Sequence, residues 1–158
     1  MDIGLAGLLA ILPILGASAV SDLRALRIPN LHVLAVLCVF AICAPFLPSW
    51  SELALRLTAA ALAFAAGFVL FALRMLGGGD VKMMAAVFLL VPASDNLLFL
   101  QFFSVALLMV SVGMMILQRL PAGVRPAWQS ARLQGHVPVA VAIAGGSVAL
   151  VSYRLLAA

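Results

Sequence analysis

Charged residues are scarce in this chain of 158 residues. Asp, Glu, Lys and Arg together make up only 9% of it, whereas about a quarter of a typical soluble domain is charged. Hydrophobic residues account for 66%, and the mean hydropathy is +1.28. This balance excludes an ordinary water-soluble domain and predicts an all-α, polytopic membrane protein.

Cysteine is almost absent as well. The only two, Cys38 and Cys43, lie inside an apolar stretch and are wrongly spaced for a Cys-x-x-Cys zinc site, so we expect buried free thiols. His32 and His136 have no neighbouring Cys, His or carboxylate at metal-ligand spacing. The sequence therefore predicts no metal and no cofactor. The net charge of +4 is spread singly over short loops, so nucleic acid is not an expected partner.

Long hydrophobic stretches fill most of the chain, and no linker separates them. The sequence therefore predicts a single domain over residues 1–158, a bundle of about six transmembrane helices. The fourth stretch is short for a full span, which needs about 20 residues. The six stretches cover approximately residues 3–21, 31–48, 53–74, 81–92, 97–118 and 137–156.

The basic residues predict the orientation of the bundle. Seven of the nine fall in the connections from odd to even stretches: Arg24, Arg27, Arg74, Lys82, Arg119, Arg125 and Arg132. By the positive-inside rule this side is cytoplasmic, so the N- and C-termini lie outside. No basic residue precedes the first stretch, so we expect a retained helix and not a signal peptide cleaved near Ala17-Ser18-Ala19.

The acidic residues are the rarest charged groups, with five in the whole chain. Asp2, Glu52 and Asp95 are expected on the outer side. Asp22 and Asp80 are the only two on the basic side, and each lies at the end of a hydrophobic stretch. Carboxylates near a membrane are costly and usually functional, and two of them suffice for acid/base hydrolysis of a peptide bond.

Asp80 follows three consecutive glycines, Gly77-Gly78-Gly79. Glycine disfavours a helix by about 1 kcal/mol relative to alanine, so the triplet predicts a non-helical loop that lines a water-accessible niche. A plain turn with Asp80 as the N-cap of the fourth helix is the alternative. Lys82 could favour the ionised form of the aspartates or bind a lipid phosphate.

Asp22 has structural alternatives of its own. It could cap a helix, or it could balance the charge of Arg24 or Arg27. Pro29-Asn30 indicates a turn that ends one helix and begins the next. Taken alone, Asp22 does not identify a site.

The two motifs together resemble those of the type IV prepilin peptidases, which are membrane aspartic proteases. Their G-x-G-D motif is met by Gly77, Gly79 and Asp80, and Asp22 stands six residues before Ile28-Pro29-Asn30. The resemblance implies that Asp22 and Asp80 form a catalytic dyad. The residues that would shape the site around it are Gly77, Gly78, Gly79, Lys82, Pro29 and Asn30.

The resemblance also implies a substrate and a location. The family removes the short basic leader of prepilins and pseudopilins at the cytoplasmic face of the bacterial inner membrane. The expected partners are such a substrate, membrane lipids and other pilus assembly proteins. Because the zinc-binding cysteines of long members are missing, the chain is similar to the short branch that serves Flp/Tad-type pili, and N-methylation is not expected.

One segment departs from the family pattern. Pro138-Val139-Ala140 is similar to a Pro-Tyr-Gly segment in the last helix of short members, with Val139 and Ala140 replacing Tyr and Gly. If that Tyr shapes the substrate groove, the groove of this chain differs there.

Two other functions stay open at this point. The aspartates could relay protons or a cation in a small transporter or channel, although the stretches are almost wholly apolar. The chain could also be an inactive scaffold of a pilus assembly machine, although a scaffold has no need of both Asp22 and Asp80.

Overall fold

The computed structural model describes residues 3–121, 126, 128–132 and 136–157, and over these residues it contains helices and no strand. Two 3₁₀ turns, η1 (Ala44–Phe46) and η2 (Ala93–Asp95), join some of them. The predicted all-α class is confirmed. The helices are α1 (Ile3–Ala25), α2 (Asn30–Cys43), α3 (Trp50–Ala72), α4 (Gly78–Phe88), α5 (Asn96–Arg119), α6 (Gln129–Arg132) and α7 (Val139–Leu156).

The six predicted stretches correspond to α1 to α5 and α7, but they differ in length. Four helical segments are long and apolar enough to cross a membrane: α1, α3, α5 with η2, and α7. The second stretch was predicted to reach residue 48, but α2 ends at Cys43, and the 3₁₀ turn η1 follows with Pro45 as its second residue. α4 has 11 residues and is about 16 Å long, about half of the hydrocarbon thickness.

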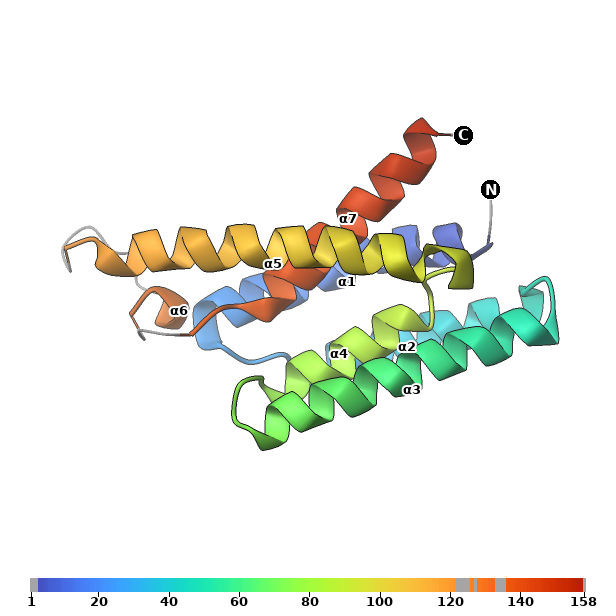
Figure 1. Ribbon diagram of the computed structural model, residues 1–158, viewed down its shortest axis with the longest axis horizontal. Helices are drawn as coiled ribbons and strands as arrows, with labels where there is room; N and C mark the ends of the chain where they lie inside the picture. The colour runs from blue at the N-terminus through green and yellow to red at the C-terminus, as the bar shows by residue number, and fades with distance from the viewer. Residues whose placement is uncertain (1–2, 122–125, 127, 133–135, 158) are drawn as a thin grey trace.

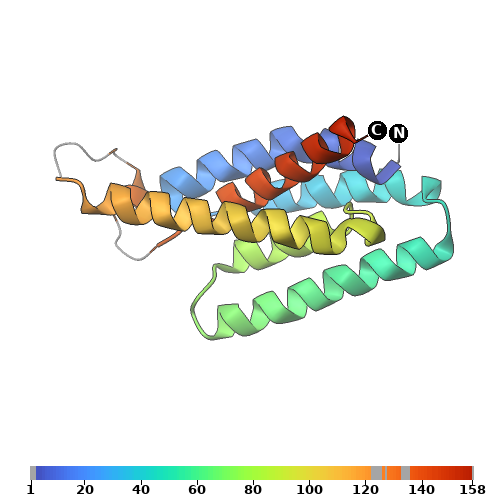
Figure 2. The ribbon, with the colours of Figure 1, turned by 45° about the horizontal axis from the view of Figure 1, so that its top comes forward.

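The helices form two groups that lie side by side (Figures 1 and 2). In one group α7 packs against both α1 and α5, and in the other α3 packs against α4. α2 contacts α1 and α4 and so joins the groups. The start of α1 and the end of α7 lie at the same end of the bundle in both views.

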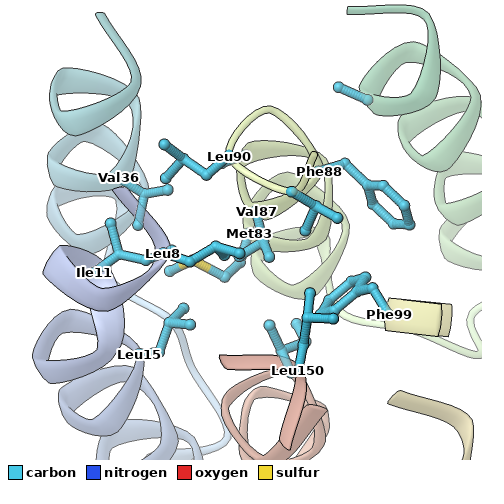
Figure 3. Packing of buried hydrophobic residues seen from close by; sticks show 14 of the residues in the cluster. Leu8, Ile11, Leu15, Val36, Met83, Val87, Phe88, Leu90, Phe99 and Leu150 are labelled. Carbon is cyan, nitrogen blue, oxygen red and sulfur yellow. The ribbon is translucent and has the colours of Figure 1, made fainter. Parts of the chain in front are cut away.

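The core lies where the two groups meet. Leu8, Ile11 and Leu15 of α1 face Met83 and Val87 of α4 (Figure 3), and all five side chains are buried. Apolar side chains inside a bundle are held by close packing and dispersion, because lipid tails are equally apolar. This packing fixes α4 against α1, the helices that carry Asp80 and Asp22.

Polar clusters stabilise the end of the bundle near the start of α5. Arg56 is 1% exposed and donates from Nε to Glu52 at 2.8 Å and from Nη1 to the Leu90 carbonyl at 3.1 Å. Asp95 is buried and forms an ion pair with Arg154 of α7. These two arginines are the ones that the orientation rule did not place on the cytoplasmic side.

The prediction for the cysteines is wrong in one respect. Cys38 and Cys43 are both free, but only Cys43 is partly buried, whereas Cys38 is exposed on α2. α2 buries only Val33 and Val36, so most of this helix faces away from the core.

Candidate active site

Asp22 lies in the last turn of α1 and points into the protein, with 4% of its surface exposed. The helix ends just beyond it, because Leu26 adopts a left-handed conformation (φ 49°) and donates its N–H to the Asp22 carbonyl at 2.8 Å. Asp22 Oδ2 accepts a hydrogen bond of 3.0 Å from the backbone N–H of Ala140, the second residue of α7.

Asp22 therefore acts as a cap, but for another helix than its own. The first N–H groups of a helix have no partner within it, and a carboxylate satisfies one of them favourably. The alternative of a charge partner for Arg24 or Arg27 is not supported, since the structure records no ion pair for Asp22 among the described residues.

Asp80 is the third residue of α4, and Gly77 donates its N–H to Asp80 Oδ2 at 3.2 Å. The expectation of a wholly non-helical glycine triplet is wrong, since Gly78 and Gly79 form the first residues of α4. The N-cap alternative is also wrong, because Gly77 holds that position. Packing of α4 against α3 and α2 outweighs the low helix propensity of glycine. Asp80 Oδ1 is buried and has no hydrogen-bond partner.

Gly79 brings the two sequence motifs into contact. A Cβ atom at this position would lie 3.0 Å from the Cβ of Ile28, so a side chain would push α4 away from the Ile28 segment. Pro29 is the N-cap of α2, and Asn30 is its first residue. Lys82 Nζ donates to Asn30 Oδ1 at 3.4 Å, and this bond joins the Asp80 motif to the Ile28-Pro29-Asn30 segment.

The two aspartates line the same cavity, although 58 positions separate them in the chain. The cavity has a volume of about 230 Å³ and lies between the end of α1 and the start of α4. It is lined by Asp22, Leu26, Arg27, Ile28, Gly77, Gly78, Gly79 and Asp80. The structure thus brings together the two carboxylates and the three glycines that the sequence singled out.

Asp80 lies outside the candidate spans, and its surroundings raise its pKa to about 7. Burial is the larger cause, and the negative charge of Asp22 adds to it. The hydrogen bond from Gly77 acts in the opposite direction. A pKa near 7 means that Asp80 holds a proton about half of the time at neutral pH, which suits a group that must both donate and accept one.

A larger, apolar cavity of about 590 Å³ runs between α3, α4 and α5. It contacts α3 from Ala59 to Leu70, and α5 from Asn96 to Leu107. Asp80 is the one described residue that lines both cavities. A carboxylate therefore stands where a small polar cavity meets a long apolar one.

The comparison with family models returns one match. The model of the type IV leader peptidase family matches residues 9–116, which include both Asp22 and Asp80. The chain belongs to the type IV leader peptidase family. Neither the comparison with curated proteins nor that with solved structures gave a match. This leader peptidase match stops before α7, so the amide of Ala140 lies beyond it.

The bond from Ala140 to Asp22 is the part of this candidate site that sequence reasoning missed. Val139 and Ala140 drew notice only as departures in a groove-forming segment. A signal was present, because Pro138 directly precedes an apolar helix and so marks a helix N-terminus with free amides. No pattern in the chain indicates which side chain those amides would contact.

The remaining polar residues near the site have structural contacts. His32 Nδ1 lies 2.9 Å from Ser18 Oγ, and Gln118 donates to the His136 carbonyl at 3.1 Å. Within the described ranges, no three or more His, Cys, Asp or Glu residues are arranged to hold a metal ion. Of the basic residues predicted to be cytoplasmic, Arg125 lies outside the described residues, as does Asp2 on the opposite side.

Proposed function

We propose that this member of the leader peptidase family is a membrane-embedded aspartic endopeptidase with Asp22 and Asp80 as its catalytic dyad. Its substrate would be a prepilin or pseudopilin, cut between a short basic leader and the apolar helix that follows. The cut would take place at the cytoplasmic face of the bacterial inner membrane. The shared cavity of the two carboxylates is the observation that carries this proposal.

The proposed chemistry divides the two roles between the aspartates. Asp22, ionised, takes a proton from a water molecule as the oxygen of that water attacks the scissile carbonyl carbon. Asp80, protonated, gives its proton to the carbonyl oxygen, so that a neutral gem-diol forms. The diol then collapses: the C–N bond breaks, the nitrogen takes the proton held by Asp22, and a hydroxyl proton returns to Asp80.

The contacts of the two carboxylates support this division. Asp80 has a pKa of about 7 and a buried oxygen with no partner, so it can hold and donate a proton. Asp22 accepts the Ala140 amide at the start of α7, and a hydrogen bond from a helix N-terminus favours a charged carboxylate.

The apolar cavity supports the proposed substrate. Its lining is almost entirely aliphatic and aromatic, and it reaches Asp80 at one end. An apolar substrate helix could lie in it while the leader remains on the polar side, near Arg27. Membership of the short, Flp/Tad-type branch and the absence of methylation stay predictions from the sequence.

The test is leader removal in cells that express the chain together with a prepilin. Wild type should shorten the prepilin on a gel, and Asp22→Asn and Asp80→Asn should each slow cleavage by at least about a hundredfold, the usual range for loss of an acid/base group. Asp95→Asn is the matched control, since it removes a carboxylate at the other end of the bundle. Processing at the wild-type rate by either dyad variant would refute the dyad.

A further inference from the structure

One polar atom stands apart in the lining of the apolar cavity. Asn96 Oδ1 is buried and has no hydrogen-bond partner. Only two buried side-chain atoms are in this condition among the described residues, and the other is Asp80 Oδ1. Both residues line the same cavity. A buried acceptor without a donor lowers stability by about 1–3 kcal/mol. A bound molecule that supplied a donor to Asn96 would remove this cost.

The two unpaired atoms lie toward opposite ends of the cavity. α4 runs away from Asp80, and a short connection with the 3₁₀ turn η2 leads from its end to Asn96, where α5 begins. α5 then runs back in the direction opposite to α4 (Figure 1), and it lines the cavity as far as Leu107. Eleven residues of helix cover about 17 Å at 1.5 Å each. α3 contacts the cavity over the same length, from Ala59 to Leu70.

The length and chemistry of the cavity define what would fill it. An α-helix that lies along this cavity, with one face in it, would place about 11 residues between Asp80 and Asn96. Its surface would be apolar, to match the lining, except at the level of Asn96. A side chain with a hydrogen-bond donor at that level would satisfy Oδ1, whereas a wholly apolar helix would leave it unpaired.

We infer that Asn96 is a specificity-determining residue. Its Oδ1 accepts a hydrogen bond from a donor on the substrate helix, about 10–14 residues after the scissile bond. This inference rests on the proposed peptidase function. Asn96 touches no reacting atom, so it selects the helix and its register without taking part in the chemistry. Ser, Thr, Asn or Gln on an otherwise apolar helix would meet its requirement.

The experiment scans the position of one polar residue along a substrate helix. The full-length enzyme in lipid nanodiscs receives prepilins that share one basic leader and one Leu/Ala helix. A single Ser is placed at each position from 6 to 18 after the cleaved bond, and kcat/KM is measured for each. Wild type should prefer Ser at positions 10–14 by about threefold to tenfold over the helix without Ser, the range for a hydrogen bond between membrane helices.

Two variants of the enzyme test whether Asn96 causes the preference for Ser. Asn96→Leu keeps the approximate size but removes the acceptor, so the ratio of kcat/KM for the helix with Ser at positions 10–14 to kcat/KM for the helix without Ser should fall to about one. Gln101→Leu is the matched control, because it removes an exposed amide from the same helix outside the apolar cavity. This control should keep the preference for Ser.

The outcomes separate the two proposals. If wild type cleaves no substrate, the proposed function fails. If wild type cleaves all of them at one rate regardless of where Ser stands, the peptidase function holds and the role of Asn96 is refuted. The same refutation follows if Asn96→Leu keeps the register preference. Because the scan of wild type alone shows or denies the preference, a poorly folded variant does not block the test.

Discussion

The carboxylates at the two ends of the bundle have opposite surroundings. Near the start of α5, Glu52 is paired with Arg56 and also accepts the Ala93 amide at 3.0 Å, and Asp95 is paired with Arg154. At the other end, Asp22 and Asp80 each accept a single backbone amide. Among the described residues, the structure gives neither of them an ion pair.

This difference separates stabilising carboxylates from reactive ones. A buried charge that is fully paired cannot change its protonation without loss of its partner, so it stabilises a fixed structure. Asp22 and Asp80 lie near Arg27 and Lys82 in sequence, yet they remain unpaired and near each other's charge. This arrangement lowers the stability of the protein, and it allows both carboxyl groups to gain and lose protons.

The largest expected effect is the loss of the buried cation at the paired end. Arg56→Met leaves Glu52 without its cation and the Leu90 carbonyl without its donor, and we expect a loss of about 3 kcal/mol in unfolding free energy. Denaturation in detergent measures it. Arg119→Met, at the exposed end of α5, is the control and should change stability by less than about 0.5 kcal/mol. If Arg56→Met lowered the unfolding free energy by as little as Arg119→Met, the ion pair with Glu52 would not stabilise this end of the bundle.

Removal of a carboxylate should change the stability of the protein in opposite directions at the two ends of the bundle. Burial raises the pKa of Asp80 from 3.8 to about 7, so the folded protein favours its neutral form, and stability due to that form is lost as pH rises from 4 to 7. Asp80→Asn should therefore be more stable than wild type above pH 7, by about 2 kcal/mol once partial exposure to water is allowed for, and equally stable below pH 4.

The matched variant at the paired end is Asp95→Asn. It breaks the ion pair with Arg154, so it should lower the melting temperature at pH 8, where Asp80→Asn raises it. Melting curves of both variants from pH 4 to 9 make the measurement. A drop in melting temperature for both at pH 8 would mean that the two ends do not differ in the way described.

The smallest expected effect is on the pH profile of cleavage. If Asp80 must be protonated to donate to the scissile carbonyl, kcat/KM should fall above pH 7 and approach a tenfold loss for each further pH unit. The expected loss between pH 7.5 and 8.5 is about eightfold for a pKa of about 7, measured with purified enzyme and substrate in detergent. A rate that is constant or rises from pH 7 to 9 would assign the proton to another group.

The sequence was sufficient to predict the class of the fold, and it singled out the two aspartates that share a cavity in the structure. Composition predicted membrane helices, because such apolar helices are stable in a lipid bilayer and not in water. The uneven distribution of basic residues predicted that Asp22 and Asp80 lie on the same side of the membrane. Both arguments depend only on composition and on the order of charged residues along the chain, which one sequence supplies completely. The length of α4 was less predictable, because the glycines Gly78 and Gly79 are helical only through contacts with other helices.

The contacts that depend on packing were out of reach of the sequence. No motif in the sequence marks Asn96, and its unpaired oxygen follows from the shape of a cavity between three helices. Likewise, no local pattern connects Gly79 to Ile28 or Lys82 to Asn30. Such pairs follow from how helices cross, which single-sequence periodicity does not specify.

The hydrogen bond between Ala140 and Asp22 has a consequence for biosynthesis. Both aspartates have been synthesised once residue 80 is made, but the amide that holds Asp22 belongs to α7, 60 residues later. A nascent chain that has inserted only α1 to α5 therefore carries both carboxylates without the bond that orients Asp22. The cavity gains its final arrangement only after α7 has been made and has packed against α1.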